Sequence, residues 1–254
     1  MIKTNNKKCY GCNSCLNVCP KFALCRNKEG VFYSIKGKRN LCISCGACDN
    51  VCPINYPIKF FDGIYEVFAV QTKNRDILNK SSSGGFFYEC CKYFLENGYK
   101  VFASRFDDDF VLIHDEIKDI YSIEPFLGSK YLKSDTAKTF CEVKKYLKSG
   151  NKVVYIGTPC EIASLVAFLK RKPDNLFLID FACHGAPSQF LFSKYLKELE
   201  KKYSSSISSV NFRDKKYGWN HFSLKVDFES GDSYVASHLV DPYMQLFFEK
   251  LFLA

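Results

Sequence analysis

One cysteine pattern occurs twice in this chain and constrains its fold more than any other feature. Residues 9–20 read CYGCNSCLNVCP and residues 42–53 read CISCGACDNVCP, at an offset of 33 residues. Each copy has the spacing Cys-x2-Cys-x2-Cys-x3-Cys-Pro. A loop with this spacing points three thiolates to one side, and its fourth cysteine reaches a second site. The sequence therefore predicts two [4Fe-4S] clusters whose ligands cross between the two copies.

The crossing gives two ligand sets, each with three cysteines from one motif and one from the other. Zinc also takes four cysteines, but zinc sites pair two Cys-x2-Cys knuckles and do not need this longer pattern twice. Cys25 lies outside the pattern and is interpreted as an ordinary thiol. The predicted ligands are Cys9, Cys12, Cys15 and Cys52 for the first cluster, and Cys42, Cys45, Cys48 and Cys19 for the second.

Composition limits the compartment and the partners. The chain has 254 residues, no apolar run long enough for a membrane span, and no signal peptide at its start. We therefore expect a cytoplasmic protein, in which clustered cysteines bind metal and do not form disulfides. The net charge is +9, but the basic residues are scattered, so we expect no nucleic-acid partner. A basic face would instead suit an acidic redox partner.

The cysteine density falls after residue 57, which predicts a domain boundary near residue 60. Residues 1–60 form the predicted two-cluster ferredoxin-type domain, and residues 61–254 form a mixed-sheet α/β domain. The expected fold class is therefore α/β (mixed α+β). We expect strands at 30–37, 65–72, 100–106, 152–157, 175–183, 206–213, 221–229 and 232–239, and helices at 86–98, 138–150, 161–172, 189–203 and 241–253.

Two loops suggest a site for an anionic cofactor. SSSGG (residues 81–85) precedes a helix, where free N–H groups attract phosphate and glycine allows close approach. The alternative is a helix cap that binds nothing. NFRDKKYGWN (residues 211–220) combines three basic residues with the single tryptophan. This segment is either an anion clamp or a basic strand end capped by aromatic residues.

Two further loops follow successive strands and should meet at one edge of the sheet, where ligands of open α/β sheets bind. GTPCE (157–161) places Cys160 near a helix N-terminus, which favours a reactive thiol, although a buried apolar thiol is the alternative. FACHGAPS (181–188) should bring Cys183 and His184 beside Cys160. His184 is a candidate hydrogen-bond or proton donor to a bound ring.

Behind the two cysteine motifs, SSSGGFF, GTPCEIASL, FACHGAPS and NFRDKKYGW resemble, in this order, the beta-subunit family of coenzyme F420 hydrogenase/dehydrogenase. The resemblance implies an iron–sulfur flavoprotein whose α/β domain holds FAD beside the clusters. It also implies further residues beyond Ala254, so we expect the chain to be incomplete at its C-terminus. It assigns the flavin side to Ser82, Ser83, Gly84, Gly85, Gly157, Thr158, Pro159, Cys160, Arg213 and Lys216, with Trp219 in the last motif and Cys183, His184 and Gly185 in the catalytic loop.

The function expected from the resemblance is oxidoreduction. A flavin exchanges a hydride with F420 or another small molecule and exchanges single electrons with clusters, so it would join the two modules. The enzyme would pass electrons between that hydride donor or acceptor and a redox partner protein or small one-electron carrier. The alternative is a ferredoxin-like electron relay or docking protein without flavin chemistry of its own.

Overall fold

The two cysteine motifs fold as two copies of one loop in the computed structural model, which describes residues 9–26, 35–57, 66–136, 139–183 and 185–248. Gly11 and Asn13 have φ angles of 66° and 61°, and their counterparts Ser44 and Gly46 have 54° and 72°. These left-handed residues flank the second cysteine of each motif and turn the loop back on itself. The neighbouring elements are α1 (Ser14–Val18), α2 (Ala47–Asn50), β1 (Leu24–Arg26), β2 (Ile35–Gly37) and η2 (Arg39–Leu41).

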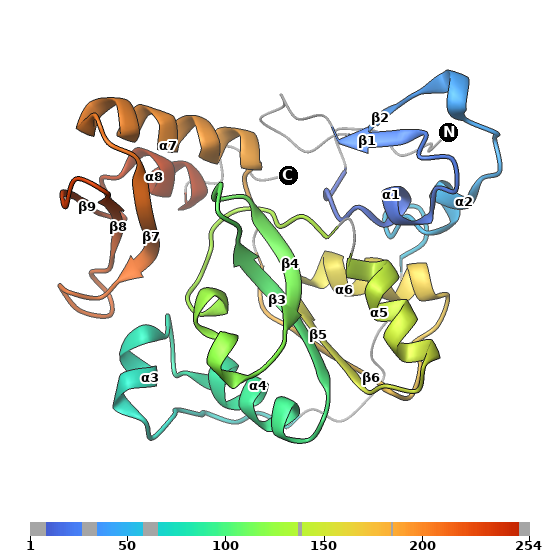
Figure 1. Cartoon of the computed structure of the whole chain (residues 1–254), viewed down its shortest axis with the longest axis horizontal. Helices are drawn as coiled ribbons and strands as arrows, with labels where there is room; N and C mark the ends of the chain where they lie inside the picture. The colour runs from blue at the N-terminus through green and yellow to red at the C-terminus, as the bar shows by residue number, and fades with distance from the viewer. Residues whose placement is uncertain (1–8, 27–34, 58–65, 137–138, 184, 249–254) are drawn as a thin grey trace.

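A four-stranded sheet in the order β4-β3-β5-β6 forms the centre of the α/β part (Figure 1). β3 pairs with β5 and β5 with β6 in parallel, whereas β4 is an antiparallel edge strand. The predicted mixed α/β fold with a mixed sheet is therefore confirmed. β4 lies where the sequence analysis expects only a connection. The strands are β3 (Lys100–Phe106), β4 (Leu112–Ile117), β5 (Val153–Gly157) and β6 (Leu176–Asp180).

Helices cover both faces of this sheet because successive strand residues point to opposite sides. Phe102 and Tyr155 are fully buried on the face covered by α5 and α6, whereas Val101 and Val154 are fully buried on the α4 face. The three helices agree with the predictions apart from their ends. They are α4 (Phe86–Glu96), α5 (Thr139–Lys148) and α6 (Pro159–Leu169), and two turns, η3 (Ile120–Ser122) and η4 (Glu124–Phe126), lie beside α4.

A second, antiparallel sheet packs with two helices around its own core. Phe192, Leu224 and Met244 are fully buried there. Gly231, with a φ of 91°, lies in the turn between the last two strands of this sheet. The elements are α7 (Gln189–Tyr203), β7 (Ile207–Asp214), β8 (Ser223–Phe228), β9 (Ser233–Ser237) and α8 (Pro242–Phe248).

The predicted strand at 65–72 is wrong. Its described part, residues 66–72, lies outside the sheets of the described chain, and Val67 and Phe68 are 92% and 73% exposed. The alternation of apolar residues suits a strand, but a strand also needs a neighbour to pair its backbone groups. Thr72 N–H instead donates to Gly84 O (2.7 Å), which ties this segment to the SSSGG loop. The helix α3 (Arg75–Lys80) follows, in a stretch where the sequence analysis predicts no helix or strand.

Some predictions fall outside the described residues. The domain boundary near residue 60 lies within 58–65, His184 is not described, and the last predicted helix continues past Phe248. Of the helices in the described ranges, none has both the length and the apolar character that crossing a bilayer requires.

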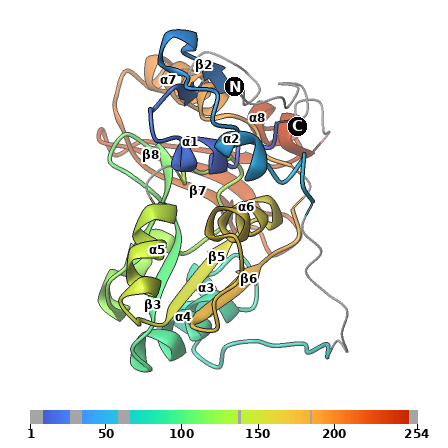
Figure 2. The same ribbon diagram turned by 90° about the vertical axis from the view of Figure 1, so that its right-hand side faces the viewer.

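The cysteine-rich region sits on the α/β part through buried polar contacts, and both views show it above α5 and α6 (Figures 1 and 2). Asn13 is 1% exposed; it donates to Asp135 Oδ1 (3.2 Å) and accepts from Arg26 Nε (3.0 Å). Arg26 forms an ion pair with Asp135 (3.1 Å). Thr136 Oγ1 donates to Cys12 O (3.0 Å). Because a buried polar group is costly without partners, these contacts fix the position of the first motif.

We expect Asn13→Gly to loosen this docking while keeping the loop. Glycine accepts the left-handed φ of 61°, so the substitution removes only the side-chain hydrogen bonds, at a cost of about 1–3 kcal/mol. Amide hydrogen exchange in α1 should become about tenfold faster or more, whereas the matched surface variant Asn97→Gly should leave α1 unchanged. Unchanged exchange in α1 of Asn13→Gly would show that docking does not depend on this residue.

Candidate functional site

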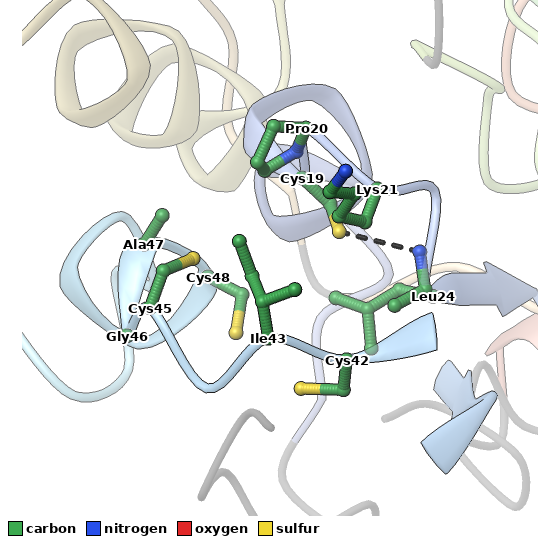
Figure 3. Close-up of a pocket in the computed structure, with 11 residues that line it drawn as sticks. Cys19, Pro20, Lys21, Leu24, Cys42, Ile43, Cys45, Gly46, Ala47 and Cys48 are labelled. Atoms are coloured by element: carbon green, nitrogen blue, oxygen red, sulfur yellow. Dashed lines mark hydrogen bonds between the residues drawn. The ribbon is translucent and has the colours of Figure 1, made fainter. Parts of the chain in front are cut away.

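Four cysteines from both motifs line one cavity beside α1 and α2 (Figure 3). Cys42, Cys45 and Cys48 come from the second motif and Cys19 comes from the first. Ala23 N–H donates to Cys19 Sγ (3.3 Å), a bond of the kind that tunes iron–sulfur clusters. This thiol set is the one predicted for the second cluster. The rest of the wall is formed by Pro20, Lys21, Ala23, Leu24, Ile43, Gly46 and Ala47.

The other four motif cysteines interact with one another around α1. Burial raises the pKa of the Cys15 thiol, and the nearby thiols of Cys12, Cys9 and Cys52 raise it further. Burial also raises the pKa of Cys9, against the effect of a hydrogen bond from Gly11 N–H (3.4 Å). Thiolates this close repel one another, so a bound cation would favour the deprotonated set. These are the residues predicted to hold the first cluster.

The donor type of the two thiol sets is one that both zinc and iron–sulfur clusters use. Among the described residues, no three His, Cys, Asp or Glu side chains are grouped so that they could hold one metal ion. A zinc ion would require sulfurs at about 2.3 Å from one centre, whereas a cube of four irons holds its thiolates farther apart. None of the fourteen cysteines forms a disulfide, so no motif sulfur is lost to a cross-link.

The first turn of α6 carries the GTPCE motif. Pro159 occupies the first turn, where a missing N–H costs nothing. The Glu161 side chain accepts from Thr158 N–H (2.8 Å) and completes a capping box. Cys160 Sγ lies 3.2 Å from Thr158 Oγ1 and 3.2 Å from Lys133 Nζ. The thiol therefore has a hydroxyl and an ammonium group as its neighbours.

The same helix touches the first cysteine motif. Ser14 Oγ donates to Ser164 O (3.2 Å), and Ser164 Oγ donates to Cys160 O (2.6 Å). Burial raises the pKa of Cys12, and a hydrogen bond with Ser164 opposes that rise. The GTPCE turn is therefore the place where the first motif meets the α/β part.

A buried polar network lies beneath this contact. Lys133 Nζ donates to Glu161 Oε1 (2.8 Å), Ser134 Oγ donates to the same oxygen (2.7 Å), and His114 Nδ1 lies 2.8 Å from Ser134 Oγ. Burial alone would lower the pKa of Lys133, but the Glu161 carboxylate raises it above its usual range. Burial alone would raise the pKa of Glu161, but Lys133 and His114 hold it below its usual range. Both members of the pair are therefore charged at neutral pH.

Segment 128–136 joins the separate motifs of the sequence. The sequence analysis expects only a connection here, yet its residues contact all four predicted loops and the first cysteine motif. The Tyr131 ring packs on Phe212 of the NFRDKKYGWN segment, with 5.5 Å between the ring centroids. The other contacts are Ser129 N–H to Ser82 Oγ (2.6 Å), Lys133 Nζ to Cys160 Sγ (3.2 Å), Lys133 N–H to Pro187 O (3.0 Å) and Thr136 Oγ1 to Cys12 O (3.0 Å).

The glycines of the SSSGG loop have a packing role. A Cβ atom on Gly84 would lie 2.5 Å from Val70 O, and one on Gly85 would lie 2.5 Å from Thr72 Cγ2. Both positions therefore need glycine to let residues 70–72 approach. This requirement is independent of the phosphate contact that the sequence predicts.

The NFRDKKYGWN segment reaches the SSSGG loop through Lys215, whose Nζ donates to Leu78 O (2.8 Å) and Ser81 O (2.6 Å). The Arg213 guanidinium lies over the Phe222 ring, 4.5 Å from its centroid. Within the described residues, the buried Arg213 Nε has no hydrogen-bond partner. The SSSGG loop and the NFRDKKYGWN segment, both predicted to bind an anionic group, therefore contact each other. The Arg213 Nε–H remains as a donor without an acceptor among the described residues.

Other predicted residues stay apart from this contact. The exposed Cys183 thiol hydrogen-bonds with Gly185 (3.4 Å to its N–H), and no hydrogen bond between described residues joins it to Cys160. The parallel pairing of β5 with β6 does bring their two following loops to one sheet edge, as expected. Lys216 and Trp219 are exposed. The predicted grouping of Cys160, Cys183 and His184 stays a prediction, because His184 lies outside the described residues.

Sequence reasoning missed Lys133, Ser134 and His114. A lysine or histidine in a connecting segment looks like any surface residue, and Lys133 is 28 positions from Glu161 in the chain. No local pattern marks such a pair. Only the pairing of β4 with β3, and of Ile113 with Asp135, brings these residues to the start of α6.

A family model matches the later part of the chain. Residues 150–243 match the family model that describes the C terminus of the beta subunit of coenzyme F420 hydrogenase/dehydrogenase. This segment is therefore similar to the C-terminal part of that beta-subunit family. It contains the GTPCE, FACHGAPS and NFRDKKYGWN motifs that suggest the same family from the sequence. No curated protein matches the chain.

A solved structure of the F420-reducing [NiFe] hydrogenase complex from Methanosarcina barkeri, obtained with xenon derivatization, also matches. The identity is 17% and the TM-score is 0.44. The match covers 66% of this chain and 58% of that one. A likeness this slight says nothing about activity, and the similarity to the beta-subunit family rests on the family model alone.

We expect Gly157→Ala to destabilise the protein. A Cβ here would lie 3.0 Å from Glu161 Oε2, 3.2 Å from Tyr155 Cε1 and 3.3 Å from His114 Nε2. All three side chains are buried, so the added methyl group should cost about 1–3 kcal/mol. Thermal unfolding followed by circular dichroism under anaerobic conditions should show a lower Tm. An equal or higher Tm would mean that the network tolerates the methyl group and is not tightly packed.

Proposed function

We propose that this chain is an iron–sulfur flavoprotein oxidoreductase of the F420 hydrogenase/dehydrogenase beta-subunit type. It transfers electrons between a small hydride donor or acceptor, F420 or another molecule, and a one-electron carrier through two [4Fe-4S] clusters. We place it in the cytoplasm, where a reducing environment suits fourteen cysteines that form no disulfide. Residues 1–60 act as the two-cluster domain and residues 61–254 as the flavin domain.

The observation that carries the proposal is the position of Cys19. It belongs to the first motif, yet it lines the same cavity as Cys42, Cys45 and Cys48 of the second. Crossed ligation is what two clusters of the bacterial ferredoxin type require. A pair of independent four-cysteine sites would have kept Cys19 with its own motif.

The two cluster sites differ in their surroundings. This difference supports an order for the two clusters along the electron path. The first motif packs on α6 and on segment 128–136, so its cluster would face the flavin domain. The second motif is open to solvent, with Ile43 and Leu41 exposed by 58% and 42%. We propose that a one-electron carrier docks at this outer side, so that electrons move between the carrier, the outer cluster and the inner cluster in sequence.

The flavin would be held at the junction of the SSSGG loop and the NFRDKKYGWN segment. The unused Nε donor and the charge of Arg213 suit a phosphate of FAD, and Lys215 holds the loop beside it. When bound, the flavin supplies the exchange between hydride and single electrons. Lys216 would add positive charge, and Cys183 and His184 would contact the reacting ring. These last roles come from the family resemblance.

Anaerobic purification followed by absorbance spectroscopy tests the whole proposal. We expect flavin bands on top of a broad iron–sulfur shoulder, with FAD added if the protein is isolated without it. Iron–sulfur absorbance that never includes a flavin signal would favour the electron-relay alternative. A colourless protein with stoichiometric zinc would contradict both.

Arg213→Met should weaken FAD binding. Losing a charge-assisted hydrogen bond costs about 1.5–3 kcal/mol, so the Kd should rise tenfold or more. Fluorescence titration with FAD measures the Kd, and the iron content should stay unchanged. Lys225→Met on β8 is the matched control, because its charge is paired with Asp227 at 2.9 Å. Equal affinity of Arg213→Met and wild type would exclude Arg213 from the flavin site.

Cys19→Ser should damage the second cluster and leave the first intact, because Cys19 serves the other motif's site. Electron paramagnetic resonance of the reduced protein should lose the signal of one cluster and the spin coupling between the two. Cys25→Ser, a matched change outside the motifs, should keep both signals. Should Cys19→Ser keep a complete, spin-coupled pair of clusters, Cys19 is not a ligand.

A further inference from the structure

A strained aromatic residue lies beside the cavity of the second cysteine motif. Phe22 has a φ of 49°, a left-handed conformation that is costly for a bulky side chain, and it is 79% exposed. Its chain neighbours Lys21 and Ala23 both line the cavity together with Cys19 (Figure 3). Phe22 N–H donates to Cys19 O (3.4 Å), and Ala23 N–H donates to Cys19 Sγ (3.3 Å). The turn that makes these bonds therefore leaves an apolar ring in solvent, where the ring gains nothing from burial.

More exposed apolar residues and a second lysine adjoin the same cavity. Ile43 lines it and is 58% exposed, and Leu41, two positions earlier, is 42% exposed. Lys38 is exposed, and its N–H donates to Ala23 O (2.7 Å), which brings it beside the turn of Phe22. The outer face, as we name this surface, consists of Lys21, Phe22, Lys38, Leu41 and Ile43.

The charge around the outer face has one sign. In the sequence, segments 19–26 and 35–48 contain five basic residues and no acidic one. Arg26 uses its charge in the ion pair at the contact with the α/β part. Lys21 and Lys38 are exposed and form no ion pair with another described residue. Their positive charge is therefore left for a partner.

We propose that the outer face docks an acidic electron-carrier protein. This inference rests on the proposed function, which puts a one-electron carrier on this side of the molecule, and it adds the chemical class of that carrier. On docking, one electron passes between the carrier and the second cluster, and no bond forms or breaks.

The composition of the outer face favours a protein over a small carrier. A small molecule binds in a pocket that encloses most of its surface, whereas Phe22, Leu41 and Ile43 lie open to solvent. Aromatic and aliphatic anchors bordered by charged residues are typical of protein interfaces. The two lysines would attract an acidic protein from a distance and orient it toward the cavity.

Binding of the full chain, with both clusters, to an immobilised acidic ferredoxin tests the role of charge. In biolayer interferometry at low ionic strength, Lys21→Glu/Lys38→Glu should raise the Kd about tenfold or more, because two attractions become repulsions. Arg171→Glu/Lys172→Glu changes the net charge equally, in the exposed loop between α6 and β6, and should keep the wild-type Kd. Equal Kd values for the two double variants would overturn the inference.

Phe22→Gly separates docking from folding. Glycine adopts a φ of 49° without the steric cost, so the Tm should stay equal or rise. The Kd for the ferredoxin should nevertheless rise about threefold or more, at low and at high ionic strength, because an apolar contact is lost. A Kd equal to that of the wild type would overturn the docking role of Phe22.

Electron transfer measured by stopped flow distinguishes this inference from the proposed function. Lys21→Glu/Lys38→Glu should slow cluster reduction by the reduced ferredoxin about tenfold or more, but should not slow reduction by methyl viologen, a small cationic carrier. Wild-type clusters that methyl viologen reduces, but that no ferredoxin binds or reduces, would overturn the inference and leave the proposed function standing. A wild-type protein without clusters would contradict the proposed function itself.

Discussion

The carboxylate of Glu161 is the constraint on which the arrangement of this molecule depends. A buried charge is costly unless it is paired and fully hydrogen-bonded. Glu161 meets this requirement by accepting from Lys133 Nζ, from Ser134 Oγ and from the N–H of Thr158. These donors come from segment 128–136 and from the turn before α6. One side chain therefore fixes two parts of the fold that are distant in sequence.

The other contacts of the site depend on the position that Glu161 gives to segment 128–136. Once segment 128–136 lies against α6, Ser129 reaches the SSSGG loop at one end and Thr136 reaches the first cysteine motif at the other. The cysteine-rich region then docks on the same surface through Asn13 and Arg26. The helix that begins with GTPCE also touches the first cysteine motif directly, through the hydrogen bond from Ser14 Oγ to Ser164 O.

The sequence predicts the parts of this arrangement that repeat or alternate. The duplicated cysteine spacing predicts two equivalent ligand loops, and the structure gives both loops left-handed residues at the equivalent positions Asn13 and Gly46. Alternating strands and helices foretell the mixed sheet. The 65–72 stretch shows the limit, since its apolar alternation suits a strand but no neighbour in the described sheets pairs with it. Lys133 and Glu161 show another limit, since a long-range pair leaves no local pattern.

The central claim is that the two motifs hold two clusters with crossed ligands. Mössbauer spectroscopy of the iron-57-enriched, anaerobically purified protein, together with iron and sulfide analysis, tests it most directly. The account predicts about eight iron atoms and eight sulfides per chain, all in cubes of four irons. Iron bound as single ions, one cluster only, or zinc in place of iron would contradict it.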